Sequence, residues 1–259
     1  MVKLHLVALG SSFAAGPVIE PIINKAAMRS GRNYAHQLAE KLDAELTDLT
    51  ASGATLLNQT VFNKTVLEPQ LEGFPANADI VTITAGGNEL GYSGGQMIDS
   101  YLSYAGPLKW FISKYRGRPT TDVDADELSR RFCAVVDRIK SIAPTAEIYL
   151  AEYPAVFGDA TTPGRDVPLT AGQVSYYRER ARVLNAGYAQ AAAARPGVDL
   201  VPVGKASEGH EVGIADTWMF GFGLTMPYYG QVPYHPNLAG HTAVADMLYE
   251  RIKASDHSV

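Results

Sequence analysis

Four short stretches of the chain combine glycine or proline with residues that can carry out acyl transfer. They are residues 10–13 (Gly-Ser-Ser-Phe), 52–55 (Ser-Gly-Ala-Thr), 86–89 (Gly-Gly-Asn-Glu) and 232–237 (Val-Pro-Tyr-His-Pro-Asn). A serine hydroxyl becomes a nucleophile when a histidine removes its proton. Backbone and amide N–H groups can then stabilise the oxyanion that forms. Together, the four stretches supply a serine, a histidine, a glycine backbone and an asparagine amide.

Each stretch also has a purely structural explanation. The serines after Gly10 can cap a short helix, and the loop around Gly53 can be an ordinary turn. Asn88 can cap the segment that follows it. A lone histidine is usually structural, although His235 lies in a rigid turn between two prolines just before a helix, where a base would need to be held. The first loop is no phosphate-binding loop, because neither Gly-Lys-Ser/Thr nor Gly-x-Gly-x-x-Gly occurs there.

The elements that position these stretches follow from the hydrophobic pattern. Apolar runs predict strands at residues 3–9, 44–50, 79–84, 147–152 and 198–203. Helical patterns cover residues 31–42, 124–143, 170–195 and 238–252. Asp-x-x-Glu at Asp124 and Thr-x-x-Gln at Thr170 are capping patterns. Asn237 is the predicted N-cap of the last helix.

Alternation of strand and helix is typical of an α/β fold. We predict a doubly wound, flavodoxin-like parallel sheet of about five strands with helices on both faces. In such sheets, ligands bind at the carboxyl ends of the strands, close to a topological switch point. The stretches around Ser12, Gly53 and Asn88 each follow a predicted strand.

Composition limits the class of protein. The chain has 259 residues, of which 46% are hydrophobic and 19% charged, so we predict a single domain over residues 1–259. A net charge of −5 without a basic cluster argues against nucleic acid and anionic membranes as partners. No segment approaches the roughly 18 apolar residues of a membrane span. We expect a cytoplasmic location for the chain as written, or secretion if a leader has been removed.

Cysteine and metal chemistry are not expected. Cys133 is the single cysteine and lies in an apolar helical pattern, so it is a predicted core residue. Alternating Asp122, Asp124 and Asp126 lack the glycine and the final glutamate of a calcium-binding EF-hand loop. Five histidines lack ligand spacing: His5, His36, His210, His241 and His257. We therefore expect no metal ion and no organic cofactor.

The order of the four stretches resembles that of the SGNH hydrolases, also called GDSL esterases and lipases, over most of the chain. This resemblance implies that Ser12 is the nucleophile and His235 the base. The oxyanion hole would consist of the backbone N–H groups of Ser12 and Gly53 and the side chain of Asn88. The implied activity is hydrolysis of carboxylic esters through an acyl-enzyme, without a cofactor. Ser11 is then a neighbour that shapes the turn.

Three positions depart from the family pattern. Ser11, Glu89 and Val232 stand where the family has aspartate. Val232 matters most, because the missing carboxylate would orient the histidine. We predict a Ser–His dyad in which the backbone carbonyl of Val232 accepts the Nδ1–H of His235, an arrangement that some family members resemble. Two carboxylates elsewhere in the chain are alternatives: Asp216 and Glu211.

Aromatic residues are concentrated in two segments next to these stretches. Residues 91–123 form a long insertion after Asn88, and residues 217–234 precede His235. The aromatics are Tyr92, Tyr101, Tyr104, Trp110, Phe111 and Tyr115 in the first segment, and Trp218, Phe220, Phe222, Tyr228, Tyr229 and Tyr234 in the second. Long loops beside a site often form lids or binding walls. We predict an apolar acyl or aryl pocket covered by residues 91–123, with core packing as the alternative.

Other functions remain open for the same residues. An acyltransferase or a thioesterase would use the same serine and histidine on a small-molecule ester or thioester. A non-catalytic binding protein would keep the fold without turnover, and the missing carboxylate at Val232 favours that alternative.

Overall fold

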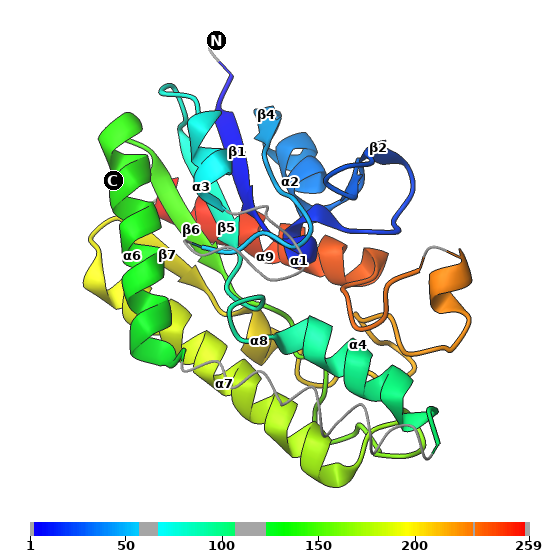
Figure 1. The fold of residues 1–259 in the computed structure, drawn as a ribbon. Helices are drawn as coiled ribbons and strands as arrows, with labels where there is room; N and C mark the ends of the chain where they lie inside the picture. Colours follow the sequence, from blue (N-terminus) through cyan, green and yellow to red (C-terminus); the bar gives the residue numbers. More distant parts are fainter. Residues whose placement is uncertain (1–2, 57–66, 107–122, 230, 257–259) are drawn as a thin grey trace.

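Five parallel strands form a sheet through the middle of the molecule (Figure 1). The computed structural model describes residues 3–56, 67–106, 123–229 and 231–256. The strands, in their order across the sheet, are β4 (Glu45–Asp48), β1 (His5–Gly10), β5 (Ile80–Thr84), β6 (Glu147–Ala151) and β7 (Val198–Val201). This order is the flavodoxin-like arrangement, with its switch point beside β1. The predicted fold class and all five predicted strands are confirmed.

Helices cover both faces of the sheet (Figure 1). On one face, α2 (Tyr34–Leu42) packs against α9 (Leu238–Asp256). On the other, α6 (Ala125–Ile142) packs against α7 (Ala171–Ala194). The shorter elements are α1 (Ser12–Ala15), α3 (Leu67–Glu72), α4 (Tyr92–Ser103), α8 (Val203–Ala206), the 3₁₀-helix η1 (Met226–Tyr229) and a hairpin of β2 (Ile22–Asn24) with β3 (Arg29–Ser30).

The sheet divides the core into two parts because successive strand side chains point to opposite faces. In β1, Val7 and Leu9 pack in the core that contains α6 and α7, whereas Leu6 and Ala8 pack in the core that contains α2 and α9. Every residue of β1 is buried. A central parallel strand covered on both faces therefore appears in the sequence as a continuous apolar run. Cys133 is buried in the first core, as predicted.

The predicted helix caps are present. The Asp124 carboxylate accepts the Glu127 N–H at 2.8 Å, and Thr170 forms a capping box at the start of α7. Asn237 accepts the Gly240 N–H at 2.9 Å at the start of α9. The helix predicted from residue 31 begins at Tyr34 instead.

The insertion predicted at residues 91–123 starts with a helix. α4 occupies its first part, and residues 107–122, which include Trp110, Phe111 and Tyr115, lie outside the described residues. The predicted lid therefore stays a prediction, as does the assignment of residues 1–259 to one domain. None of the described helices is long and apolar enough to cross a membrane.

Gly10 turns the chain out of β1 against the end of β5. Its φ is +150°, and an added Cβ would lie 2.3 Å from the Thr84 carbonyl oxygen. We expect Gly10→Ala to lower the free energy of unfolding by about 3 kcal/mol, because the new methyl group forces the two strand ends apart. Urea denaturation measures this change. Gly172→Ala in α7 is the control, since an added Cβ there has no neighbour within 4 Å; an equal effect of both substitutions would contradict the argument.

Candidate active site

Ser12 and His235 lie 223 positions apart in the chain and form a direct hydrogen bond. Ser12 begins α1 just after β1, and His235 lies just before α9. The Nε2 atom of His235 is 2.8 Å from the Oγ atom of Ser12. Both residues are buried, with exposed fractions of 2% for His235 and 7% for Ser12. In this geometry a histidine can act as a general base toward a serine hydroxyl.

A short antiparallel bridge holds the histidine loop. The backbone of Phe220 bonds to two residues of this loop: the Phe220 N–H donates to the His235 carbonyl at 2.8 Å, and the Tyr234 N–H donates to the Phe220 carbonyl at 3.0 Å. Met219 and Pro236 form the bridge itself. The segment at residues 217–220 therefore fixes the backbone on both sides of the imidazole.

The Nδ1 atom of His235 bonds to the backbone carbonyl of Pro233 at 2.8 Å. The prediction that the carbonyl belongs to Val232 was therefore wrong by one residue. The reason is Tyr234, whose φ of 60° lies in the left-handed region and turns the Pro233 carbonyl toward the ring. A carbonyl acceptor requires a proton on Nδ1, so Nε2 is left to accept the proton of Ser12.

Neither alternative carboxylate reaches the histidine. Glu211 accepts the Gly209 N–H at 3.1 Å, and Asp216 lies 3.4 Å from the ring of His210. Within the described part of the chain, no carboxylate hydrogen-bonds to His235. The arrangement is thus a dyad oriented by a main-chain carbonyl.

Burial lowers the pKa of His235 from 6.5 to about 4, and the Pro233 carbonyl opposes this shift. His235 is therefore neutral near pH 7 and able to accept a proton. A second buried histidine, His241, accepts the Tyr34 N–H at 3.1 Å through Nδ1. Burial, together with the proximity of His235, lowers the pKa of His241 to about 3.

These two histidines predict that stability falls in acid. Both bind a proton more readily in the unfolded chain, so their contribution is complete above the unfolded pKa of about 6.5 and is lost as the pH falls toward 4 and 3. The shift at His235 corresponds to about 3 kcal/mol. We expect the urea concentration at the unfolding midpoint to decrease as the pH is lowered from 7 to 4. His241→Gln, whose amide oxygen can still accept the Tyr34 N–H, should flatten this dependence; an unchanged pH dependence would contradict it.

The Gly53 loop lies beside the Ser12 loop. It follows β4, the neighbour of β1 on one side. The Ala51 N–H donates to the Gly10 carbonyl at 3.0 Å, which ties the two loops together. Gly53 is half-buried and has a φ of 83°. Its backbone N–H therefore belongs to a loop fixed against the Ser12 loop.

The Asn88 loop follows β5, the neighbour of β1 on the other side. The Ser11 N–H donates to the Thr84 carbonyl at 3.0 Å, and the Asn88 amide donates to the Ala54 carbonyl at 2.7 Å. An amide nitrogen carries two hydrogens, so one remains for a ligand. The loops that carry all four predicted stretches thus meet at the carboxyl edge of the sheet.

Glu89, which stands where the family has aspartate, has a structural role. Its carboxylate is buried and accepts the Leu56 N–H. Burial raises the pKa of Glu89, while the Leu56 N–H and the charge of Arg131 oppose this shift. Glu89 therefore links the Asn88 loop to the end of the Gly53 loop.

The sequence reasoning missed two aromatic residues beside the dyad. The ring of Phe13 packs against the ring of His235, with centroids 5.1 Å apart, and Tyr153 stacks on Phe13 at 4.0 Å. For Phe13, the signal in the sequence was its position directly after Ser12. Tyr153 follows the end of β6, and its place at the carboxyl edge of the sheet was the only signal for it.

The predicted aromatic wall divides into core and surface residues. Tyr92 and Tyr234 are buried, whereas Tyr104 and Tyr228 are exposed. Phe222 connects the two groups: its ring centroid lies 6.0 Å from that of Tyr234 and 6.0 Å from that of Tyr104. A row of aromatic rings therefore runs from the residue beside His235 to the end of α4.

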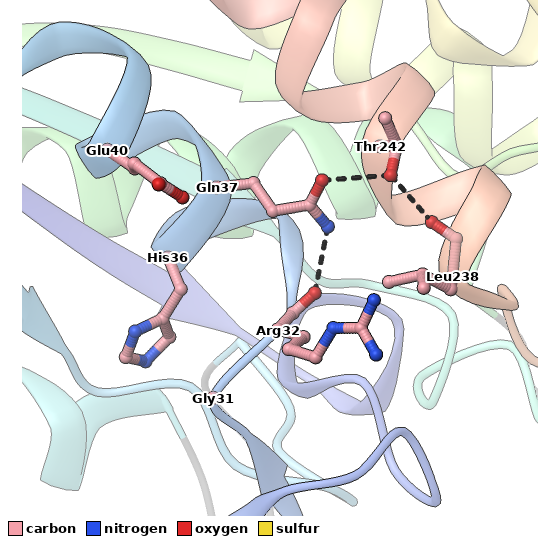
Figure 2. Close-up of a pocket in the computed structure, with 7 residues that line it drawn as sticks. All are labelled: Gly31, Arg32, His36, Gln37, Glu40, Leu238 and Thr242. Carbon is pink, nitrogen blue, oxygen red and sulfur yellow. Dashed lines mark hydrogen bonds between the residues drawn. The ribbon is translucent and has the colours of Figure 1, made fainter.

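Two other hollows lie apart from these residues. One, of about 400 Å³, lies between α2 and α9 (Figure 2). Gln37 crosses it by donating to the Arg32 carbonyl at 2.8 Å and accepting from Thr242 at 2.8 Å. The other, of about 540 Å³, is lined by Glu152 among other residues. Burial raises the pKa of Glu152 to about 7, and the Gly204 N–H, which donates to its carboxylate, opposes this shift. Neither is lined by Ser12, Gly53, Asn88, Val232 or His235, although Glu211 lines the second.

No metal site accompanies the dyad in the part of the chain that the structure describes. Within these residues, no group of three or more histidine, cysteine, aspartate or glutamate side chains is placed to hold a metal ion.

Comparison with known proteins places the chain in a family. The model of the GDSL-like Lipase/Acylhydrolase family matches residues 8–243. Lipase 2 of Streptomyces coelicolor is 29% identical, over 94% of this chain and 84% of its own length.

Two crystal structures share the fold. Phospholipase A1 from Streptomyces albidoflavus NA297 has a TM-score of 0.73 and 21% identity, over 97% of this chain and 100% of its own. An extracellular lipase from Streptomyces rimosus has a TM-score of 0.70 and 23% identity, over 95% and 99%. Since the family match spans the chain from β1 into α9, this protein belongs to the GDSL-like lipase/acylhydrolase family and is a carboxylic-ester hydrolase.

Proposed function

We propose that the enzyme cleaves its ester through an acyl-enzyme on Ser12, with His235 as the general base. The observation that carries this proposal is the 2.8 Å bond between the two side chains, with Nδ1 of the same ring held by the Pro233 carbonyl. Oγ of Ser12 attacks the acyl carbon while Nε2 of His235 takes the hydroxyl proton. The imidazolium then protonates the leaving alcohol as the ester C–O bond breaks.

Deacylation repeats the same steps with water. His235 removes a proton from the attacking water, and Ser12 leaves with that proton when the acid is released. The Pro233 carbonyl keeps the tautomer correct throughout but supplies only a dipole. The imidazolium therefore lacks the full negative charge that a triad carboxylate would provide.

The oxyanion hole of this mechanism consists of the backbone N–H groups of Ser12 and Gly53 and the side chain of Asn88. The support is the set of bonds that ties the three loops together at one sheet edge. Donors that are already in place stabilise the developing charge without reorganisation, and one such donor contributes about 10²–10³-fold in kcat.

We further propose that the ester carries an apolar acyl or aryl group. The aromatic row formed by Tyr234, Phe222, Tyr101 and Tyr104 supports this, since it starts beside His235. Relatives described as lipases and as a phospholipase A1 favour an acyl ester. Phe222→Ala should shift the ratio of kcat/KM for long over short p-nitrophenyl esters; an unchanged ratio would exclude Phe222 from the acyl wall.

Two measurements test the reaction itself. A fluorophosphonate probe should label the parent enzyme at Ser12, as shown by peptide mass spectrometry, whereas a non-catalytic binding protein would stay unlabelled. Hydrolysis of p-nitrophenyl acetate and decanoate, with product analysis in the presence of alcohol acceptors and of thioesters, separates an esterase from an acyltransferase or a thioesterase. Transfer to the alcohol as the main reaction would favour the acyltransferase.

The place of action stays a prediction. Immunoblotting of cells and of culture medium from the producing organism distinguishes a cytoplasmic protein from a secreted one.

A further inference from the structure

Ser11, the residue immediately before the nucleophile, bonds to a distant tyrosine. It is fully buried and does not cap α1 with its side chain. Its Oγ atom lies 2.5 Å from the Oη atom of Tyr153. The side chain of Ser11 therefore anchors the nucleophile loop to the end of β6 rather than to its own helix.

The ring of Tyr153 supports the dyad from behind. It stacks on Phe13 with an interplanar angle of 14°, and Phe13 in turn packs against His235. Tyr153 is buried, with an exposed fraction of 4%. Burial raises the pKa of Tyr153 above its ordinary value, so the group is a neutral phenol at physiological pH.

The hydroxyl end of the same ring also lies against the Asn88 loop, at Gly87. An added Cβ at Gly87 would be 2.5 Å from Cε2 and 3.2 Å from Oη of Tyr153, so only glycine lets the ring approach this closely. The Gly87 amide is also directed at the phenol oxygen, where it opposes the rise in pKa. One phenol therefore contacts the residue before the nucleophile and the residue before the oxyanion amide.

We propose that Tyr153 is a positioning residue for this reaction: acting through Ser11 and Gly87, it sets the nucleophile loop and the oxyanion loop at a fixed separation. The hydroxyl group lies behind the backbone of both loops and does not touch the ester. Its effect belongs to the transition state, when attack by Ser12 and stabilisation of the oxyanion must occur at one carbon atom. This inference rests on the function proposed above.

The test compares Tyr153→Phe, which keeps the stacked ring, with Ser11→Ala and the double variant. We expect each single substitution to lower kcat by about tenfold with KM within about twofold, because the lost contacts matter only in the transition state. The double variant should lose no more than either single one, since both substitutions break the same hydrogen bond. The rate of fluorophosphonate labelling at Ser12 should fall in parallel with kcat.

Tyr149→Phe is the matched control. Tyr149 is a buried tyrosine on β6, the strand that ends shortly before Tyr153, but its hydroxyl bonds to Glu147 and Ser255, each at 2.8 Å. The Tyr149→Phe substitution should lower the melting temperature without changing kcat.

Three results would overturn the proposal. The first is a Tyr153→Phe enzyme with unchanged kcat and only the stability loss of the control, because Tyr153 would then be a core residue. The second is a change in KM alone, and the third is multiplication of the two single losses in the double variant. Ser12→Ala is assayed in parallel: if it keeps its turnover, the proposed function fails, whatever Tyr153 does.

Discussion

Replacing Ser12 with alanine is expected to lower kcat for ester hydrolysis by about 10⁴-fold or more, because the proposed mechanism forms the acyl-enzyme on the Ser12 hydroxyl. Its Oγ atom is the one that the imidazole of His235 contacts at 2.8 Å. Alanine suits the first turn of α1, so the variant should keep its fold. The measurement is the initial rate on p-nitrophenyl butyrate, normalised to folded protein by circular dichroism.

Ser11→Ala is the matched control for this prediction. It removes the same hydroxyl group one position earlier, where the side chain faces Tyr153 instead of the histidine. We expect a loss of only about tenfold in kcat and continued labelling by a fluorophosphonate. The opposite ranking of the two variants would make Ser11 the nucleophile and contradict the proposed mechanism.

The second large effect concerns His235. His235→Gln should lower kcat by about 10⁴-fold, since glutamine cannot accept the proton of Ser12. In the parent enzyme, kcat/KM should rise with pH through about 4, the value to which burial lowers the pKa of this base, and then stay level toward neutral pH. An exposed histidine would instead lose activity below about pH 6.5. A rise centred near pH 6.5 would contradict the buried, uncharged environment.

A carboxylate at Val232 tests what the backbone carbonyl replaces. Val232 is half-buried and lies three residues before the histidine. In Val232→Asp, a negative charge that reaches the ring should raise the pKa of His235 and move the rise in kcat/KM to higher pH. Val232→Asn, which has nearly the same shape without the charge, should leave the profile unchanged. Identical profiles for the two variants would show that this position does not reach the imidazole.

The sequence by itself determined the sheet and the edge at which the site lies. Some patterns depend only on residues that are close together in the sequence. Examples are the buried run His5–Gly10 and the capping residues Asp124 and Thr170, which could be recognised without the fold. A parallel sheet then brings the loops after its strands to one edge. For this reason the stretches around Ser12, Gly53 and Asn88 could be grouped before their contacts were known.

Only the tertiary structure decided which groups surround the dyad. The carbonyl that orients His235 belongs to Pro233 because the backbone at Tyr234 is left-handed, and the sequence pattern does not encode that conformation. Tyr153 meets Ser11 across 142 positions, and the low pKa of His235 arises from burial by several elements at once. These properties depend on distances between segments far apart in the chain, which the packing of the whole fold sets.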